Sequence, residues 1–174
     1  MDMFTAAQEK GYKAERYEFD EHLDKFDLTL KHPKRLLVVL CSSTGDGEAP
    51  DNGNKFFRYL NKNAKIARDS GKEDAKIFSH LKFTWLGLGD SDYTSFHKCP
   101  RTVVSSFETL GAKLYHYFGK ADEAIGLELE VEPWIKYFWK ALPKVYDEVK
   151  KEQLEMQRKN TQMVKEEKKV HFLQ

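Results

Sequence analysis

The sequence predicts an α/β fold built on a parallel sheet with helices on both faces. Two apolar runs, residues 36–41 and 83–88, lack the alternation of a half-exposed strand and are typical of strands buried on both faces. Each run leads into a polar turn that contains glycine, and a helical pattern follows each turn. Because loops that leave parallel strands gather at one edge of the sheet, we expect a ligand site at that edge.

The elements around the first buried run have weaker patterns. A short helix is expected near Met3, and Gly11 is placed to end it. In residues 15–20, aromatic and charged side chains alternate, which predicts a strand with one solvent-exposed face. After the first run, Pro50 is expected to open a helix.

The second half of the chain continues the alternation of strands and helices. The polar residues 61–80 are expected to run over the surface before the second buried run. Residues 103–110 have helical spacing, and Gly111 is expected to end that helix. Residues 114–118 then predict another strand, and Pro133 is expected to open a helix with a wide aromatic stripe.

We expect one domain over residues 1–142, followed by a charged helical tail or linker over residues 143–174. In that last part, apolar side chains recur once per heptad, at Val149, Met156, Met163 and Val170. One apolar position per heptad is half of a coiled-coil seam, so a solvated helix or a linker is favoured over a coiled coil.

The composition excludes several classes of protein. A length of 174 residues with 40% hydrophobic content suits one compact domain with some excess. The net charge of +1 gives no reason to expect nucleic acid or an anionic membrane as the partner. Cys41 and Cys99 are too few for a disulfide scaffold or a zinc site, which favours a reducing compartment. No apolar run approaches the ~20 residues of a membrane span and no basic signal sequence is present, so a cytoplasmic location is expected.

The turn after the first buried run, residues 42–47, offers hydroxyl groups and free backbone N–H groups. Such groups can hydrogen-bond the edge of a heteroaromatic ring, and Gly45 allows the backbone to approach it closely. The alternative is a glycine turn before a capped helix, and this turn alone does not decide between the two.

The turn after the second run, residues 88–97, is more informative. Gly87 and Gly89 are expected to leave space for a flat ligand, while Tyr93 and Phe96 offer ring faces for stacking. Tyr93 lies in a polar run with little core to fill, so a stacking role is favoured over a plain surface tyrosine.

Two other kinds of chemistry are less well supported. His97 and Cys99 resemble a base and a nucleophile, but no third group is placed to orient them and no oxyanion loop is evident. We therefore interpret both as loop residues. A phosphoaccepting receiver-like domain would need an acid pair after a first strand, and the sequence shows no such strand.

The three segments expected at this edge, residues 42–54, 88–98 and 119–132, are rich in acids. Against Lys98 and Lys120 they carry an acidic edge of ten residues: Asp46, Glu48, Asp51, Asp90, Asp92, Asp122, Glu123, Glu128, Glu130 and Glu132. On a nearly neutral protein, such an edge speeds encounter with a basic partner more than it tightens the complex. Acids near helix starts also complement helix dipoles, so part of the excess is structural.

Four segments together resemble, in order and spacing, the FMN domain of the diflavin reductase family: S-S-T-G-D-G, L-G-L-G-D-S-D-Y-T-S-F, L-G-A-K and G-L-E-L-E-V-E-P-W-I. The match covers about residues 11–142. It implies a flavodoxin-like three-layer α/β/α sandwich with a parallel sheet and with FMN as the cofactor. Thr44 stands where the more distant NADPH–cytochrome P450 reductases have a second stacking tyrosine, so the closer resemblance is to the methionine synthase reductase branch.

The resemblance also implies the cofactor-binding residues. The first turn would contact the isoalloxazine ring, the second would wrap it with Tyr93 on the outer face, and an acid pair would lie near the flavin. The residues implied are Ser42, Ser43, Thr44, Gly45, Leu88, Gly89, Asp90, Ser91, Asp92, Tyr93, Thr94, Ser95, Phe96, His97, Asp122 and Glu123.

The partners implied are an FAD/NADPH reductase module that reduces FMN, and a protein with a haem or cobalamin centre that accepts the electrons. No catalytic side chain, metal ligand or nucleic-acid site is expected. The alternative function is a flavin-free interaction module that keeps the fold and the acidic edge. Visible flavin absorbance of the purified protein, with FMN added, distinguishes the two.

Members of the family begin with an apolar strand and a Ser/Thr-rich phosphate loop, and this sequence is expected to start within the helix that follows them. In the strand order 2-1-3-4-5 the absent strand is central, so the segments at Tyr17 and Leu37 would lack the neighbour between them. We therefore expect weak FMN binding and self-association through exposed sheet edges.

Overall fold

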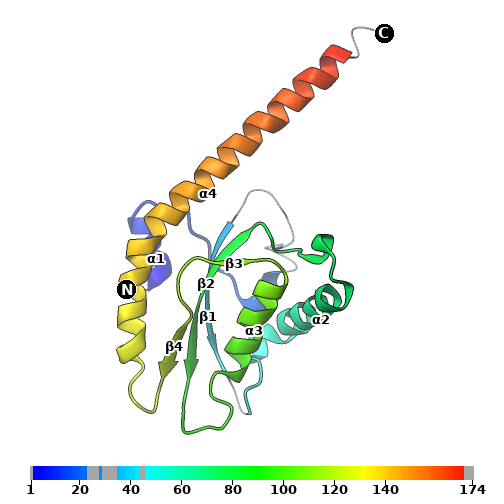
Figure 1. Cartoon of the computed structure of the whole chain (residues 1–174). Helices are drawn as coiled ribbons and strands as arrows, with labels where there is room; N and C mark the ends of the chain where they lie inside the picture. The colour runs from blue at the N-terminus through cyan, green and yellow to red at the C-terminus, as the bar shows by residue number, and fades with distance from the viewer. Residues whose placement is uncertain (1, 23–27, 29–34, 44–45, 171–174) are drawn as a thin grey trace.

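The computed structural model describes residues 2–22, 28, 35–43 and 46–170. A sheet lies between two sets of helices (Figure 1). At its centre, β1 (Arg35–Ser42) pairs in parallel with β2 (Leu81–Gly89) along the whole length of β1. β3 (Lys113–Leu114) and β4 (Gly119–Asp122) pair in parallel with β2, near its start and near its end respectively. The predicted parallel α/β sandwich is confirmed.

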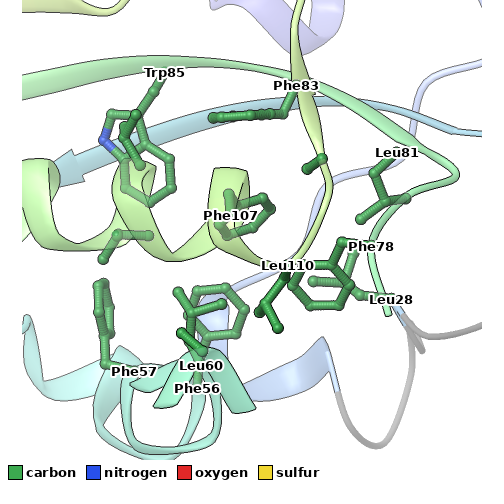
Figure 2. Packing of buried hydrophobic residues seen from close by; sticks show 14 of the residues in the cluster. Leu28, Phe56, Phe57, Leu60, Phe78, Leu81, Phe83, Trp85, Phe107 and Leu110 are labelled. Carbon is green, nitrogen blue, oxygen red and sulfur yellow. The ribbon is translucent and has the colours of Figure 1, made fainter. Parts of the chain in front are cut away.

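Two helices cover one face of the sheet, α2 (Asn54–Ser70) and α3 (Lys98–Thr109). Their apolar side chains form a core with β2, which Figure 2 shows from close by. Phe107 of α3 lies within this core, its ring centroid 5.1 Å from that of Phe83 and 5.2 Å from that of Phe78. Full burial of such a side chain stabilises the fold by about 1.5–3 kcal/mol. Gly111 has φ 92°, a left-handed value that favours glycine. α3 ends at Thr109, just before this glycine, as predicted.

Pro50 precedes a short 3-10 helix, η2 (Asp51–Gly53), which leads into α2. The expectation that residues 61–80 run over the surface is wrong for their first half, because α2 continues to Ser70 and buries Ala64 and Ala67. Small side chains at helical spacing let this part of α2 pack closely, although most of its residues are polar.

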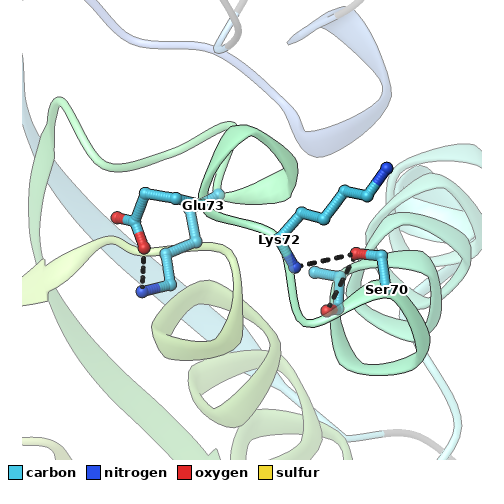
Figure 3. A network of polar contacts seen from close by, with 5 residues as sticks. Ser70, Lys72 and Glu73 are labelled. Carbon is cyan, nitrogen blue, oxygen red and sulfur yellow. Dashed lines mark hydrogen bonds and ion pairs between the residues drawn. The ribbon is translucent and has the colours of Figure 1, made fainter.

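The chain then turns back toward the sheet through polar contacts (Figure 3). The N–H of Lys72 donates to Oγ of Ser70 at 3.3 Å. Lys76 pairs with Glu73, the first residue of the 3-10 helix η3 (Glu73–Ala75), with 2.7 Å between Nζ and Oε2. Both charged groups are largely exposed, so this pair contributes little to stability.

The opposite face of the sheet is covered by α1 (Met3–Glu9) and by the first part of α4 (Glu128–Val170). Trp134 and Phe138 of α4 are stacked, with ring centroids 5.5 Å apart, and pack against Leu86 of β2 in a second core. This second core holds α4 across β2 and β4.

β1 is only partly covered on one of its two faces, and it is paired along only one of its edges among the described residues. The expectation that both apolar runs are covered on both faces is confirmed for β2 and wrong for β1, where Val38 is 41% and Leu40 is 49% exposed. Both share a face with Leu36, which packs beneath α4. On that face α4 therefore covers the start of β1 but not Val38 or Leu40. Among the described residues, β1 pairs only with β2.

The predicted strand at residues 15–20 is wrong. Residues 12–18 have no regular secondary structure, and Phe19–His22 form the 3-10 helix η1. A strand needs a hydrogen-bonded neighbour, and the described residues provide none beside this segment. Phe19 instead packs on α2, with its ring stacked 5.3 Å from that of Phe56.

The predicted strand at residues 114–118 is wrong except for Leu114, because β3 ends at Leu114 and residues 115–118 form the connection to β4. The carbonyl of Tyr117 leaves the strand ladder and accepts hydrogen bonds from Oγ1 of Thr84 at 3.4 Å and from Nε1 of Trp134 at 3.0 Å. These side-chain donors replace the backbone pairing that a continuous strand would have.

α4 is longer than expected at both ends. It begins at Glu128, one turn before Pro133, because the backbone N–H groups of Leu129 and Val131 already bond to Gly126 and Leu127. It then continues without a break through Pro143 to Val170 and projects away from the sheet (Figure 1). The residues expected to be a helical tail or linker are therefore helical as far as they are described. Along the described helices, no stretch is long and apolar enough to cross a bilayer.

Candidate functional site

The carboxyl ends of β1, β2 and β4 meet at one edge of the sheet. In the parallel register, Ser42 is paired with Leu88, and Gly89 with Asp122. Three loops therefore leave the sheet side by side: the first loop follows β1 (described residues 43 and 46–50), the second is 90–97, and the third is 123–127. The expectation that these segments share one edge is confirmed.

Backbone and carboxylate hydrogen bonds tie the loops together. The N–H of Glu123 donates to the carbonyl of Gly89 at 2.8 Å. Oδ1 of Asp122 accepts from the N–H of Ser91 at 2.9 Å and from that of Ala124 at 3.1 Å. One carboxylate thus fixes the start of the second loop against the third.

The first loop packs against the second. Gly47 has φ 86°, and a Cβ atom there would lie 2.8 Å from Cβ of Lys98 and 3.0 Å from that of Ser95. Both the left-handed backbone and the close approach require glycine at this position. On the other side, the N–H of Ser43 donates weakly to the carbonyl of Leu88, with 3.4 Å between nitrogen and oxygen.

The second loop is a series of tight turns that presents Tyr93 to solvent. Oδ1 of Asp90 accepts from the N–H of Asp92 at 2.9 Å, and the N–H of Tyr93 donates to the carbonyl of Asp90 at 3.2 Å. The Phe96 N–H then donates to the Tyr93 carbonyl at 3.1 Å. Tyr93 is 63% exposed, so its ring face is free to stack on a planar ligand.

Gly87 and Gly89 do not leave space for a ligand, contrary to the prediction. A Cβ atom at Gly87 would lie 2.8 Å from Nδ1 of His97, and one at Gly89 would lie 3.1 Å from the ring of Phe96. The two glycines make room for the protein's own rings. The flat ligand predicted there would therefore lie against the outer side of the loop, where Tyr93 is exposed.

Ser43 supplies the polar part of the site. Its Oγ is buried at the end of β1 and has no hydrogen-bond partner among the residues that the structure describes. A buried hydroxyl without a partner is costly, and a ligand with a polar edge would satisfy it. Thr44 and Gly45, the other two residues predicted in this turn, lie outside the described residues.

The structure places the remaining predicted residues at the same edge, with different exposures. Leu88 packs into the core beneath α4, and Ser42 ends β1 with an exposed side chain. Ser95 and Phe96 are half-buried, and His97 is buried. Those exposed at the rim are Ser91, Asp92, Thr94 and Glu123.

His97 and Cys99 do not form a reactive pair. Cys99 lies in the first turn of α3, not in a loop as expected, and its thiol interacts with that of Cys41. Both ring nitrogens of His97 are without hydrogen-bond partners.

The acidic edge is mostly exposed. Of its ten carboxylates only those of Asp90, Asp122 and Glu130 are half-buried. Hydrogen bonds from the Ser91 side chain and backbone hold the pKa of Asp122 below its ordinary value. This carboxylate therefore stays charged near neutral pH.

One surface feature was not predicted. Ile125 in the third loop is 67% exposed, and Leu129 follows it in the first turn of α4 with a similar exposure. Apolar residues exposed beside a ligand site can contact either the ligand or a docking protein. An isoleucine directly before Gly126, in a turn, was the available signal.

A comparison with protein families matches residues 3–134 to the flavodoxin family. The match spans more than half of the chain, so the chain belongs to the flavodoxin family. Among solved structures, a cysteine-to-alanine mutant of flavodoxin from Pseudomonas aeruginosa matches 80% of this chain and 85% of its own, with a TM-score of 0.56. The two are 24% identical, so that likeness supports the fold alone.

The chain is also similar to curated diflavin enzymes. Methionine synthase reductase of Caenorhabditis elegans is 36% identical over 137 residues, and that of Homo sapiens is 39% identical over 134. NADPH-dependent diflavin oxidoreductase 1 of Danio rerio is 30% identical over 128 residues. The alignments cover 79%, 77% and 72% of this chain but only 18%, 18% and 20% of the relatives, so the chain spans about a fifth of their length.

These comparisons confirm the predicted resemblance to the diflavin reductases. Membership in the flavodoxin family assigns FMN as the cofactor and electron transfer as the role of the domain. The described residues fit the ring of FMN, because a buried unpaired hydroxyl and an exposed tyrosine ring lie on neighbouring loops of one edge. Ser43 would bond the edge of the isoalloxazine ring, and Tyr93 would cover its outer face.

Proposed function

We propose that this chain is an electron-transfer domain that receives electrons from an FAD/NADPH reductase module and passes them to a protein with a haem or cobalamin centre. The observation that carries the proposal is the edge where three loops meet, with Ser43 and Tyr93 placed to hold a flavin ring. The names of the relatives, a methionine synthase reductase and an NADPH-dependent diflavin oxidoreductase, support it.

The protein's own contribution is to bind and to orient. When bound, FMN supplies the redox chemistry, since a flavin accepts and donates electrons without help from a catalytic side chain. The loops fix the ring at the rim of the sheet through Ser43 and Tyr93. The rim position leaves one side of the ring close to the surface, where a redox partner can approach.

The acidic edge supports a basic docking partner. Most of its carboxylates are exposed, and they lie on the three loops of the candidate ring site or in the elements directly before and after them. Exposed charges of one sign steer an oppositely charged protein to the site and raise the rate of association. Exposed Ile125, beside the same rim, adds an apolar contact for a docked partner.

Titration of the purified chain with FMN, and separately with riboflavin, tests the proposal. Binding is followed by quenching of flavin fluorescence. Saturable quenching by riboflavin supports a site for the ring, because riboflavin lacks the phosphate. A much higher affinity for FMN than for riboflavin would show that this chain also holds the phosphate.

The alternative function, a flavin-free interaction module, rests on the same acidic edge. It requires the fold and the charges but no ligand. If neither flavin quenches, while a basic haem protein still binds in a salt-dependent manner, then the electron-transfer proposal is wrong and the interaction module is favoured.

A further inference from the structure

His97 joins the second loop to α3 and is fully buried at that junction. Its backbone has φ 53°, the one positive value that the described residues show outside glycine. A side chain with a Cβ atom adopts this conformation rarely, and only where its surroundings require it. The position of the imidazole is therefore fixed by its contacts.

The imidazole fills a slot behind the second loop. On the sheet side it lies against the backbone of Gly87 and Gly89, where Cβ atoms would come within 2.8 Å of Nδ1 and 3.2 Å of Cε1. On the other sides, the ring centroid lies 4.1 Å from that of Phe96 and 6.2 Å from that of Phe118. Glycine backbone and two aromatic rings thus pack against the imidazole.

The slot favours the neutral imidazole. Burial lowers the pKa of His97, and the backbone of Ala121 opposes this, although neither ring nitrogen reaches hydrogen-bond geometry. The charged groups that face the ring are Arg101 on α3 and Lys120 on β4, which lower its pKa further, and Asp122 on β4, which raises it. A second proton on this ring would be buried without an acceptor.

We propose that His97 is a positioning residue for the flavin loop: its neutral imidazole holds residues 90–96 against the sheet, and protonation releases them. The proposal rests on the proposed function for the role of the loop in flavin binding. The release itself follows from the contacts of the imidazole and belongs equally to the protein without ligand.

Release of the ring moves the loop because the two are joined by short connections. His97 follows Phe96 directly, and the N–H of Lys98 donates to the carbonyl of Ser95 at 2.9 Å. If the imidazole leaves its slot, Phe96 loses its ring neighbour, and the turn that presents Tyr93 loses its support. Flavin affinity then falls through the position of Tyr93.

The pH range follows from the direction of the shift. In the open loop the imidazole regains its ordinary pKa of about 6.5. The pKa of the buried ring is lower, so the closed loop is fully stable above about 6.5 and loses stability as the pH falls toward the buried value. Between the pKa of the open loop and that of the closed loop, the population of the open loop rises about tenfold for each unit by which the pH falls, since opening takes up one proton.

The test uses the full chain without ligand, and amide hydrogen exchange measured by NMR from pH 5 to 8. After correction for the intrinsic rates, protection of the Phe96 and Lys98 amides should fall below about pH 6.5, the ordinary pKa of histidine. The imidazole signals of His97 should titrate at a lower pH, and protection should stop falling where they do. Protection that stays constant over this range, or an imidazole that titrates without any loss, overturns the proposal.

Two variants separate positioning from packing. His97→Asn keeps a residue that tolerates the left-handed conformation but does not titrate, so its loop protection should be independent of pH. His116→Gln is the matched control, because burial also lowers the pKa of His116 while its Nε2 pairs with the carbonyl of Trp134 at 3.2 Å on the α4 face. The control should keep the pH dependence. If His97→Asn does not fold, the imidazole titration of the unmodified chain still decides.

A parallel FMN titration over the same pH range separates this proposal from the proposed function. A fall in affinity that follows the loss of protection supports both. Loop opening at low pH in a chain that binds no flavin supports the role of His97 and contradicts the flavin assignment. Flavin binding that is independent of pH, with a loop that opens, contradicts the role of the loop in flavin binding.

Discussion

The carboxylate of Asp122 accepts the backbone N–H of Ser91, with 2.9 Å between Oδ1 and the nitrogen, and so joins the end of β4 to the loop that follows β2. The same oxygen accepts the N–H of Ala124. A side chain predicted to lie near the flavin thus fastens two of the three loops to each other. It shapes the site whether or not it also touches the ligand.

Removal of this acceptor should loosen the site. We expect Asp122→Ala to weaken flavin binding severalfold, because the second and third loops are then no longer joined through a side chain. Asp46→Ala is the matched control, since it removes the same charge from the acidic edge and its exposed carboxylate is not among the predicted flavin contacts. Fluorescence titration measures both variants, and equal losses of affinity would contradict a role for the Asp122 hydrogen bonds.

The same contact should be insensitive to pH near neutrality. The pKa of Asp122 is lowered by its hydrogen bonds from Ser91, so the stability that it contributes is present above its ordinary value of about 3.8 and is lost as the pH falls through the lowered value. After correction for the intrinsic rates, protection of the Ala124 amide, which donates to the same oxygen from the third loop, should stay constant from pH 5 to 8. A change with a midpoint near pH 6 would contradict this assignment and point to His97.

Tyr93 should contribute to flavin affinity without contributing to the fold. Its ring is 63% exposed, so Tyr93→Ala removes little buried area, but it also removes a stacking face worth about 0.5–1.5 kcal/mol. The expected loss is about 2- to 12-fold in affinity at unchanged melting temperature. In Tyr17→Ala, the control, a loss of affinity should appear only with a loss of folded protein. Equal losses in both variants, at a matched folded fraction, would contradict stacking.

Docking through the acidic edge should weaken as salt is added. Exposed charges are screened over about 8 Å at physiological ionic strength. With FMN bound and reduced, the rate of reduction of a basic haem protein should fall steadily across a salt series in a stopped-flow experiment. A rate that stays flat or rises with salt would mean that the acidic edge does not guide docking.

The end of α4 should be dispensable for the fold. Of the side chains on α4 that the structure describes, Val149 is the last that is buried, and beyond it the apolar Leu154, Met163 and Val164 are exposed. Deletion of residues 150–174 should shift the melting temperature by less than about 2–4 °C, the change that 1 kcal/mol produces in a domain of this size. A larger fall would mean that this part of α4 packs against another surface.

The open edge of β1 should cause self-association. Val38 and Leu40 are exposed at an edge that no other described strand pairs with. β1 has no proline and its one charge, Arg35, is at its start, so this apolar edge is a template for pairing. Val38→Lys should raise the monomer fraction in sedimentation at little cost in melting temperature. Val39→Lys, which faces the core, should instead destabilise the fold. A chain that is already monomeric at high concentration would contradict the prediction.

The strongest sequence patterns predicted the elements that dominate the structure. The two apolar runs form β1 and β2. Three loops leave the sheet at one edge, because the carboxyl ends of parallel strands lie at the same edge. The sequence pattern gave wrong predictions where secondary structure or burial depends on a neighbouring element. Alternation at residues 15–20 could not form a strand without a partner, and the coverage of β1 depends on elements that pack beside it rather than on its own side chains.

Within the site, the sequence predicted the loops but not their internal packing. Gly87 and Gly89 were expected to make room for a ligand, and the structure fills that room with His97 and Phe96. Glycine in a sequence indicates that something approaches closely, without saying what does. The link between Asp122 and Ser91 was equally hidden, since it joins residues on two different loops.

The most direct test of the central claim is NMR mapping of the flavin site on the full chain. Addition of FMN should shift the amide signals of Ser43, Tyr93 and Glu123 together, because the ring is expected to lie where their three loops meet. Signals from α2 and from the projecting part of α4 should stay unchanged. If FMN binds but shifts signals elsewhere, or shifts only one of the three loops, the site described at this edge is wrong.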